Sequence, residues 1–145
     1  MRVACLLIDH LPFKLEIQRS AHLRKYQTIL IQGSGSKRTI LDASPEIKNV
    51  LPDMPIQEAL AHCNNVNIIE ADLLWYNQMW DKILLRLSYR SPVIEPAGLG
   101  CVYVGLDGLE GMYGNENCLI NAIIQTAPSY LEPRLGIGNG KFSAY

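Results

Sequence analysis

The chain has 145 residues, a mass of 16.2 kDa and a net charge of −1, with 48% hydrophobic and 19% charged residues. This size and composition describe one globular domain, or one domain with a small subdomain, and exclude a disordered chain. The near-zero net charge also argues against a nucleic-acid binder held by charge alone, but it does not exclude a nucleic-acid enzyme with a local basic surface.

The first half of the chain alternates between expected strands and expected helices. In chain order we expect a strand over residues 3–8, a helix over 13–23, a strand over 28–32, a helix over 56–62 and a strand over 66–69. The first strand is a continuous apolar run (VACLLI), which is typical of burial on both faces, and Asp9 follows its end. The GSGS stretch is expected to join two strands, and Asp53 is expected to cap the second helix.

The second half continues the alternation with a helix over 73–87, a strand over 101–106, a helix over 117–125 and a strand over 135–137. The first of these helices has the clearest pattern, because its apolar residues step by three and four positions and predict one packed face. Those residues are Leu73, Tyr76, Trp80, Ile83 and Leu87. Strands that alternate with helices predict an α/β or α+β fold, with a sheet covered by helices.

Several familiar motifs are excluded because the residues they require are not at the required positions. The GSG stretch lacks the third glycine of a dinucleotide-binding loop, and Leu135 and Phe142 stand where a Walker A motif needs glycine and Ser or Thr. The histidines and cysteines show no metal-ligand spacing; they are His10, His22, His62, Cys5, Cys63, Cys101 and Cys118. The N-terminus lacks the apolar stretch of a secretory signal, and no run approaches the ~20 residues of a membrane span. We therefore expect a cytoplasmic protein with free thiols and no membrane partner.

The order of several weak motifs is more specific than any one of them. Asp9-x-x-x-Phe13 is followed by TILI, Asp72-x-x-x-Tyr76, SPVIE, CVYVGLDG and LGIGNGKFSAY. Over the whole chain this order resembles the palm and fingers region of the Y-family (UmuC/DinB-like) translesion DNA polymerases. The resemblance implies a ferredoxin-like palm with a small fingers subdomain. Residues 1–24 and 70–145 would form the palm and 25–69 the fingers, without thumb and little-finger domains.

The resemblance also implies a phosphoryl-transfer site in which several carboxylates hold two divalent ions. Asp9 matches the carboxylate that the family places after its first strand, and it would be the residual metal ligand. The family's second acidic residue in that motif falls on Leu11, and its adjacent Asp-Glu pair falls on Gly100 and Cys101. A thiol is a poor ligand for Mg²⁺, so these replacements imply a lost metal site.

The nucleotide-binding positions that the resemblance implies are changed as well. The family's Tyr and Arg for the triphosphate fall on Ala43 and Glu46, and a carboxylate at the second position would repel phosphate. Lys141 alone matches a phosphate-facing family residue. Catalytic residues are therefore not expected.

Within the family this pattern is most similar to the catalytically inactive ImuB-type relatives. The resemblance implies a non-catalytic adaptor in DNA repair and SOS mutagenesis, which contacts a sliding clamp, other mutagenesis-complex proteins and, through missing domains, DNA. No cofactor is then expected. Two alternatives stay open: an active, Mg²⁺-dependent nucleotidyltransferase with a metal site rebuilt around Asp9, Asp107 or Glu110, and an unrelated α/β interaction domain.

Overall fold

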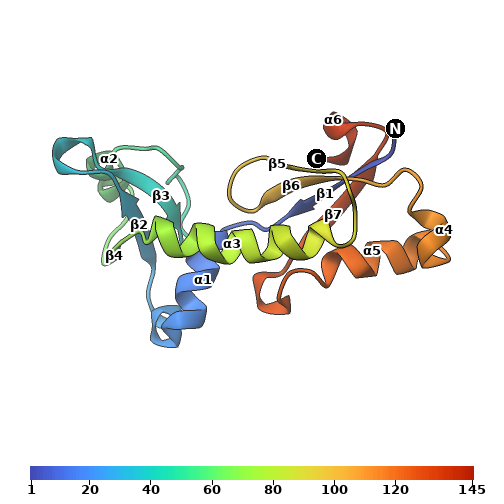
Figure 1. The fold of residues 1–145 in the computed structure, drawn as a ribbon. Helices are drawn as coiled ribbons and strands as arrows, with labels where there is room; N and C mark the ends of the chain where they lie inside the picture. The colour runs from blue at the N-terminus through green and yellow to red at the C-terminus, as the bar shows by residue number, and fades with distance from the viewer. The chain divides into compact units, whose positions relative to one another are not determined.

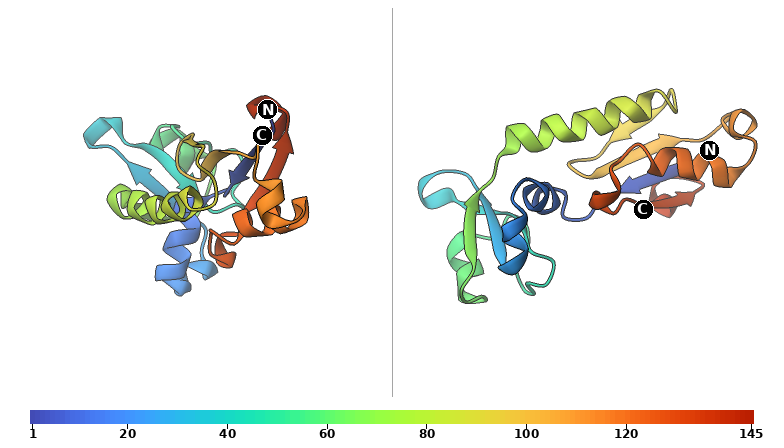
Figure 2. Two further views of the ribbon diagram at one scale, coloured as in Figure 1. Left: turned by 45° about the vertical axis from the view of Figure 1, so that its right-hand side comes forward. Right: turned by 90° about the horizontal axis from the view of Figure 1, so that it is seen from below.

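The computed structural model describes the backbone of residues 1–145 and all side chains except those of residues 142–143. Its strands are β1 (Val3–Leu7), β2 (Thr28–Gln32), β3 (Thr39–Ala43), β4 (Asn67–Glu70), β5 (Ile94–Pro96), β6 (Cys101–Gly105) and β7 (Arg134–Gly138) (Figure 1). Its α-helices are α1 (Leu11–Arg19), α2 (Ile56–Ala61), α3 (Leu73–Ser88), α4 (Glu110–Tyr113), α5 (Glu116–Ile124) and α6 (Lys141–Ala144) (Figure 2). Three 3₁₀ turns complete the chain: η1 (Ala21–Lys25), η2 (Gly35–Lys37) and η3 (Ser129–Leu131).

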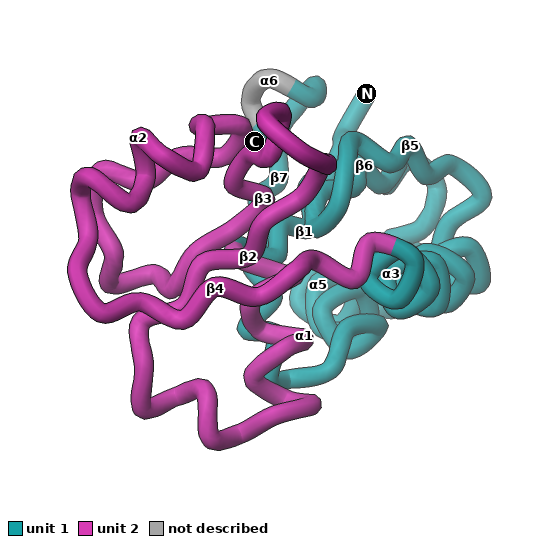
Figure 3. Tube along the Cα trace, turned by 90° about the vertical axis from the view of Figure 1, so that its left-hand side faces the viewer, with its two compact units in different colours: residues 1–9, 74–145 teal, residues 10–73 magenta. Residues whose placement is uncertain are grey.

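The chain divides into two compact units, one formed by residues 1–9 and 74–145 and the other by residues 10–73 (Figure 3). Each unit has a sheet of its own. The assignment of residues 1–24 and 70–145 to a palm and of 25–69 to fingers stays a prediction. None of the described helices is both long and apolar enough to cross a bilayer.

The first unit contains an antiparallel sheet in the order β5-β6-β1-β7. The central strand β1 is buried on both faces, as its apolar run predicted. Helices α3 and α5 cover one side of this sheet, and α6 lies on the other (Figure 3). The side chains of Ala4 and Leu6 point away from the face that holds Cys5 and Leu7, because neighbouring strand residues alternate between faces.

Helix α3 packs through the predicted face. Tyr76, Trp80, Ile83 and Leu87 are buried at steps of four, three and four residues. Leu73 was expected on this face, but it is 39% exposed. It is the first residue of the helix.

The second unit contains the sheet β3-β2-β4, in which β2 pairs antiparallel with β3 and parallel with β4. The GSGS stretch lies in the hairpin between β2 and β3, which confirms the predicted connection. A small core of buried side chains fills the unit. They are Ile29, Ile31, Ile40, Ala43 and Ala59.

Two local predictions in this unit are wrong. The helix expected over residues 13–23 starts at Leu11 and ends at Arg19, and η1 follows. Asp53 does not cap α2, because Pro55 occupies the N-cap position. Asp53 instead has a φ of 68°, and its backbone N–H donates to the carbonyl of Ile40 at 2.8 Å.

Candidate active-site region at the end of β1

Asp9 lies where the first strand leaves the sheet. Leu7 is paired with Cys101 on β6, and the backbone N–H of Ile8 donates to the carbonyl of Gly100 at 2.7 Å. Asp9 is the next residue after this hydrogen bond. The structure therefore places Asp9 beside Gly100 and Cys101, the three positions that the sequence analysis grouped together.

The carboxylate of Asp9 has a cationic partner. The guanidinium of Arg134 donates to Asp9 Oδ2 and forms an ion pair with it. Arg134 reaches this position because it lies opposite Leu7 on β7. Sequence reasoning missed Arg134, since only the pairing of β7 with β1 reveals that this arginine stands near the end of β1.

Cys101 faces another thiol instead of a carboxylate. Its Sγ lies 3.8 Å from the Sγ of Cys5, and both side chains are buried. All four cysteines are free thiols, as predicted. Burial, together with the neighbouring Cys101, raises the pKa of the Cys5 thiol to about 12. A thiol with so high a pKa stays protonated near neutral pH.

Gly100 has a φ of 85°, a conformation that residues with a side chain rarely adopt. An aspartate at this position would carry backbone strain. The local backbone therefore disfavours the carboxylate that the family resemblance implies at residue 100.

Lys141, the predicted phosphate-facing residue, forms an ion pair with Glu95. Its Nζ also lies 5.8 Å from the ring centroid of Tyr103. Glu95 lies opposite Tyr103 in the β5–β6 ladder, so the lysine spans two strands on this face. Its charge is matched by a carboxylate of the same unit, just as the charge of Asp9 is matched by Arg134.

Asp107 and Glu110 lie at the other end of the sheet. The N–H of Arg2 donates to Asp107 Oδ1 at 3.1 Å, and the guanidinium of Arg2 pairs with Glu110 and Glu116. These contacts occur beside the first residue of β1, whereas Asp9 follows its last residue. The hypothesis that Asp107 or Glu110 rebuilds a metal site around Asp9 is therefore wrong.

The donor set near Asp9 does not fit a pair of divalent ions. Among the described residues, no group of three or more His, Cys, Asp or Glu side chains could hold a metal ion. Mg²⁺ needs hard oxygen ligands, and two-metal sites need several carboxylates to balance four positive charges. Asp9 supplies one carboxylate here, and that carboxylate is already paired with Arg134.

The three other positions singled out by sequence lie in the second unit. Leu11 begins α1 and is buried. Ala43 ends β3 and belongs to the small core, and Glu46 is exposed in the following loop. None of the three offers a group that could hold a triphosphate.

Asp42, which sequence reasoning did not single out, supports the start of α1. Its Oδ2 accepts from the N–H of Phe13 at 3.0 Å, and its Oδ1 lies 2.7 Å from His10 Nδ1. The helix thus receives an N-terminal carboxylate from β3.

Comparison with known proteins gives the family. The model of the impB/mucB/samB (IMS) family matches residues 7–144. The chain belongs to this family. The DNA polymerase IV proteins of two Dehalococcoides mccartyi strains, BAV1 and CBDB1, are each 28% identical over 125 residues. The match covers 83% of this chain and 32% of each relative, so the chain spans about a third of the curated relatives it matches.

Solved Y-family polymerases share the fold. An insertion ternary complex of Dbh DNA polymerase matches with a TM-score of 0.82 and 20% identity, over 99% of this chain and 44% of that one. DinB from Sulfolobus solfataricus matches with a TM-score of 0.80 and 20% identity, over 97% and 43% of the two chains. The chain therefore has the mixed α/β fold of a Y-family palm and fingers region, as the sequence predicted. These matches contradict an unrelated α/β fold.

Proposed function

We propose that this member of the IMS family is a non-catalytic polymerase-like module that serves DNA repair as an adaptor. The observation that carries the proposal is the ion pair between Asp9 and Arg134 beside Gly100 and Cys101. The position at which the family resemblance implies a cluster of carboxylates and two metal ions holds instead one carboxylate and an internal cation. A guanidinium cannot supply the Lewis acidity or the bound nucleophile that a metal provides.

The nucleotide side of the site supports the same proposal. Ala43 and Glu46 offer no cation for a triphosphate, and Lys141 is paired with Glu95. A bound nucleotide would have to displace the carboxylate of Glu95 from Lys141. On this proposal the described residues offer neither the carboxylates that would hold two metal ions nor a cation at positions 43 and 46, so two electrostatic parts of phosphoryl transfer are missing from them.

The proposal extends to the role of the whole protein. We propose that it acts in the cytoplasm during damage-induced translesion synthesis, that DNA is bound mainly by parts of the protein outside this chain, and that a sliding clamp and other mutagenesis-complex proteins are its partners. No cofactor is proposed. The alternative of an active polymerase is favoured by the name of the Dehalococcoides relatives, DNA polymerase IV.

A primer-extension assay distinguishes the non-catalytic adaptor from an active polymerase. The whole protein that contains this chain is incubated with a primed template, four deoxynucleotides, and Mg²⁺ or Mn²⁺, beside its Asp9→Asn variant. We expect no extension by either protein, while electrophoretic shift shows that the primed template is bound. Extension that Asp9→Asn abolishes would overturn the proposal and establish an active polymerase.

A further inference from the structure

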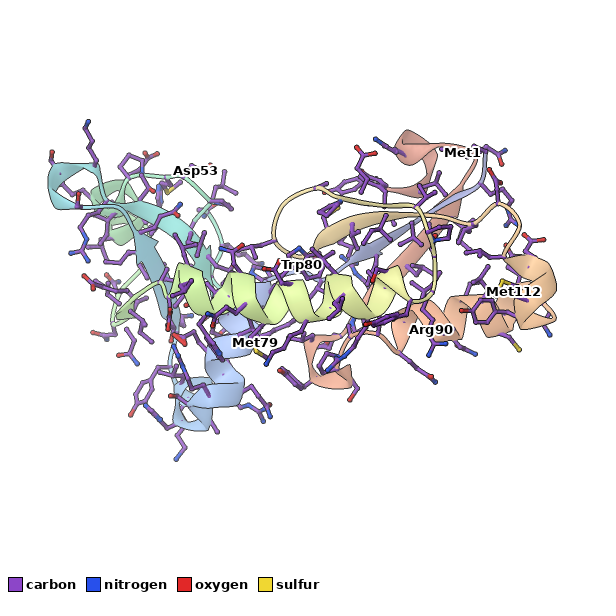
Figure 4. The ribbon with its side chains drawn as sticks, in the orientation of Figure 1. Met1, Asp53, Met79, Trp80, Arg90 and Met112 are labelled. Atoms are coloured by element: carbon purple, nitrogen blue, oxygen red, sulfur yellow. The ribbon has the colours of Figure 1, made fainter. Side chains whose placement is uncertain are left out.

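A group of basic and aromatic side chains occupies the C-terminal end of α3. Lys82 and Arg86 are four residues apart on α3, so they lie along one side of the helix, and Arg90 lies in the turn that follows Ser88, the last helical residue. All three are exposed, and Tyr89 beside them is 79% exposed. We call these four residues the basic patch; Figure 4 labels Arg90 at this end of the helix.

A cavity of about 170 Å³ opens within the basic patch. It is lined by Arg86, Tyr89, Arg90, Gln125 and Thr126, so it lies where the ends of α3 and α5 meet. Nη1 of Arg86 donates to the carbonyl of Thr126 at 3.2 Å, which holds this guanidinium at the wall of the cavity. At ~30 Å³ for a liquid water, the cavity has room for a few waters or one phosphate group.

Charge in and around the cavity favours an anion. None of the described lining residues is acidic. The one acidic residue of α3, Asp81, precedes the lining residues by more than a helical turn. Two guanidiniums in a concave site without a carboxylate are typical of phosphate recognition, because each presents several N–H donors in a plane.

Stabilisation of helix ends explains only part of this arrangement. A cation near a helix C-terminus interacts favourably with the backbone dipole, and Arg86 also bonds to a carbonyl beyond α5. This does not explain Tyr89, whose ring is mostly exposed beside the two arginines. An exposed aromatic ring next to phosphate-binding cations is the combination with which proteins hold single strands, by stacking a base beside a bound phosphate.

We propose that the basic patch binds single-stranded nucleic acid, with a backbone phosphate in the cavity and a base on Tyr89. The basic patch lies on the helical layer of its sheet, whereas Cys5, Cys101 and Lys141 lie on the opposite face with α6 (Figure 3). This proposal does not depend on whether the chain is catalytically active, since no residue of the basic patch belongs to the region around Asp9.

The test is fluorescence anisotropy of a labelled single-stranded oligonucleotide of about 12 nucleotides, titrated with the 145-residue chain at about 50 mM salt. We expect saturable binding that Tyr89→Ala weakens at least about five-fold and Tyr89→Phe leaves nearly unchanged, because phenylalanine retains the stacking ring. Arg90→Ala should weaken binding and reduce the slope of log affinity against log salt by about 0.7.

Lys37→Ala is the matched control, because it removes one positive charge from an exposed site in the other unit. We expect it to retain the parent affinity. Circular dichroism confirms that each variant is folded. Failure of the folded parent to bind, equal weakening by Arg90→Ala and Lys37→Ala, or equal affinity for a polyglutamate peptide would each overturn the proposal. The last result would assign the basic patch to acidic peptides.

Discussion

Arg134 lies opposite Leu7 in the β1–β7 ladder and forms an ion pair with the carboxylate of Asp9, two residues beyond Leu7. An internal cation thus stands beside the one family-matched carboxylate. On the same face Lys141 pairs with Glu95. In each pair the positive charge cancels the negative charge. This face therefore offers little attraction to either a divalent ion or a triphosphate.

The Asp9–Arg134 pair should contribute little to the stability of the fold. The two side chains are 49% and 65% exposed, and exposed ion pairs contribute about 0–1 kcal/mol. We expect Arg134→Gln to lower the free energy of unfolding by less than ~1 kcal/mol in urea denaturation. A loss above ~2 kcal/mol would contradict this, because it would require a desolvated pair.

Trp80 should be a major part of the core of the first unit. Its side chain is 4% exposed on the packed face of α3, and truncation of a buried tryptophan costs about 3–5 kcal/mol. We expect Trp80→Ala to lose that amount in chemical denaturation. Leu85→Ala is the control, because Leu85 lies on the same helix and is 57% exposed, so its loss should be below ~0.5 kcal/mol. Similar losses for both variants would contradict the described packing of α3.

The thiol of Cys5 should make the stability of the chain sensitive to alkaline pH. Its pKa rises from an ordinary value of 9.0 to about 12 in the folded protein, so the unfolded chain releases this proton first. The resulting loss of stability begins as pH rises through about 9 and continues towards 12, and the effect is not present below pH 9.

Denaturation of the parent and Cys5→Ser between pH 8 and 11 measures this effect. We expect the free energy of unfolding to fall more steeply with pH for the parent, because serine does not titrate in this range. Cys118→Ser, which changes an exposed thiol, should follow the parent. Parallel curves for the parent and Cys5→Ser would show that the thiol is not desolvated.

Sequence patterns predicted much of the fold. Strands β1, β2 and β6 and helices α3 and α5 have long apolar runs or a clear helical period, and they appear within one or two residues of their expected ends. Helix α1 was placed two residues late because its support comes from Asp42, which lies on a strand that the sequence pattern did not predict. Asp53 was expected to cap α2 because aspartate is a preferred N-cap residue, but Pro55 occupies the N-cap position.

The site was predictable only in part. The resemblance grouped Asp9 with Gly100 and Cys101, and the Leu7–Cys101 pair and the Ile8–Gly100 hydrogen bond bring the end of β1 to these two residues. The partners of Asp9 and Lys141 could not be predicted, because the spacing of residues along the sequence carries no information on strand register.

The partners depend instead on pairing between strands that are distant in sequence. Arg134 meets Asp9 across 125 residues, and Glu95 meets Lys141 across 46. Asp107 shows the same limit, since only the antiparallel direction of β6 places it at the far end of the sheet from Asp9.

Binding of Mn²⁺ to the chain tests the central claim most directly, because it measures the donor set around Asp9 without DNA or nucleotide. Free Mn²⁺ is measured by electron paramagnetic resonance during a titration of the parent and of Asp9→Asn. The account predicts that millimolar Mn²⁺ stays free with both proteins. Binding of one or two Mn²⁺ ions at sub-millimolar concentration that Asp9→Asn abolishes would contradict it.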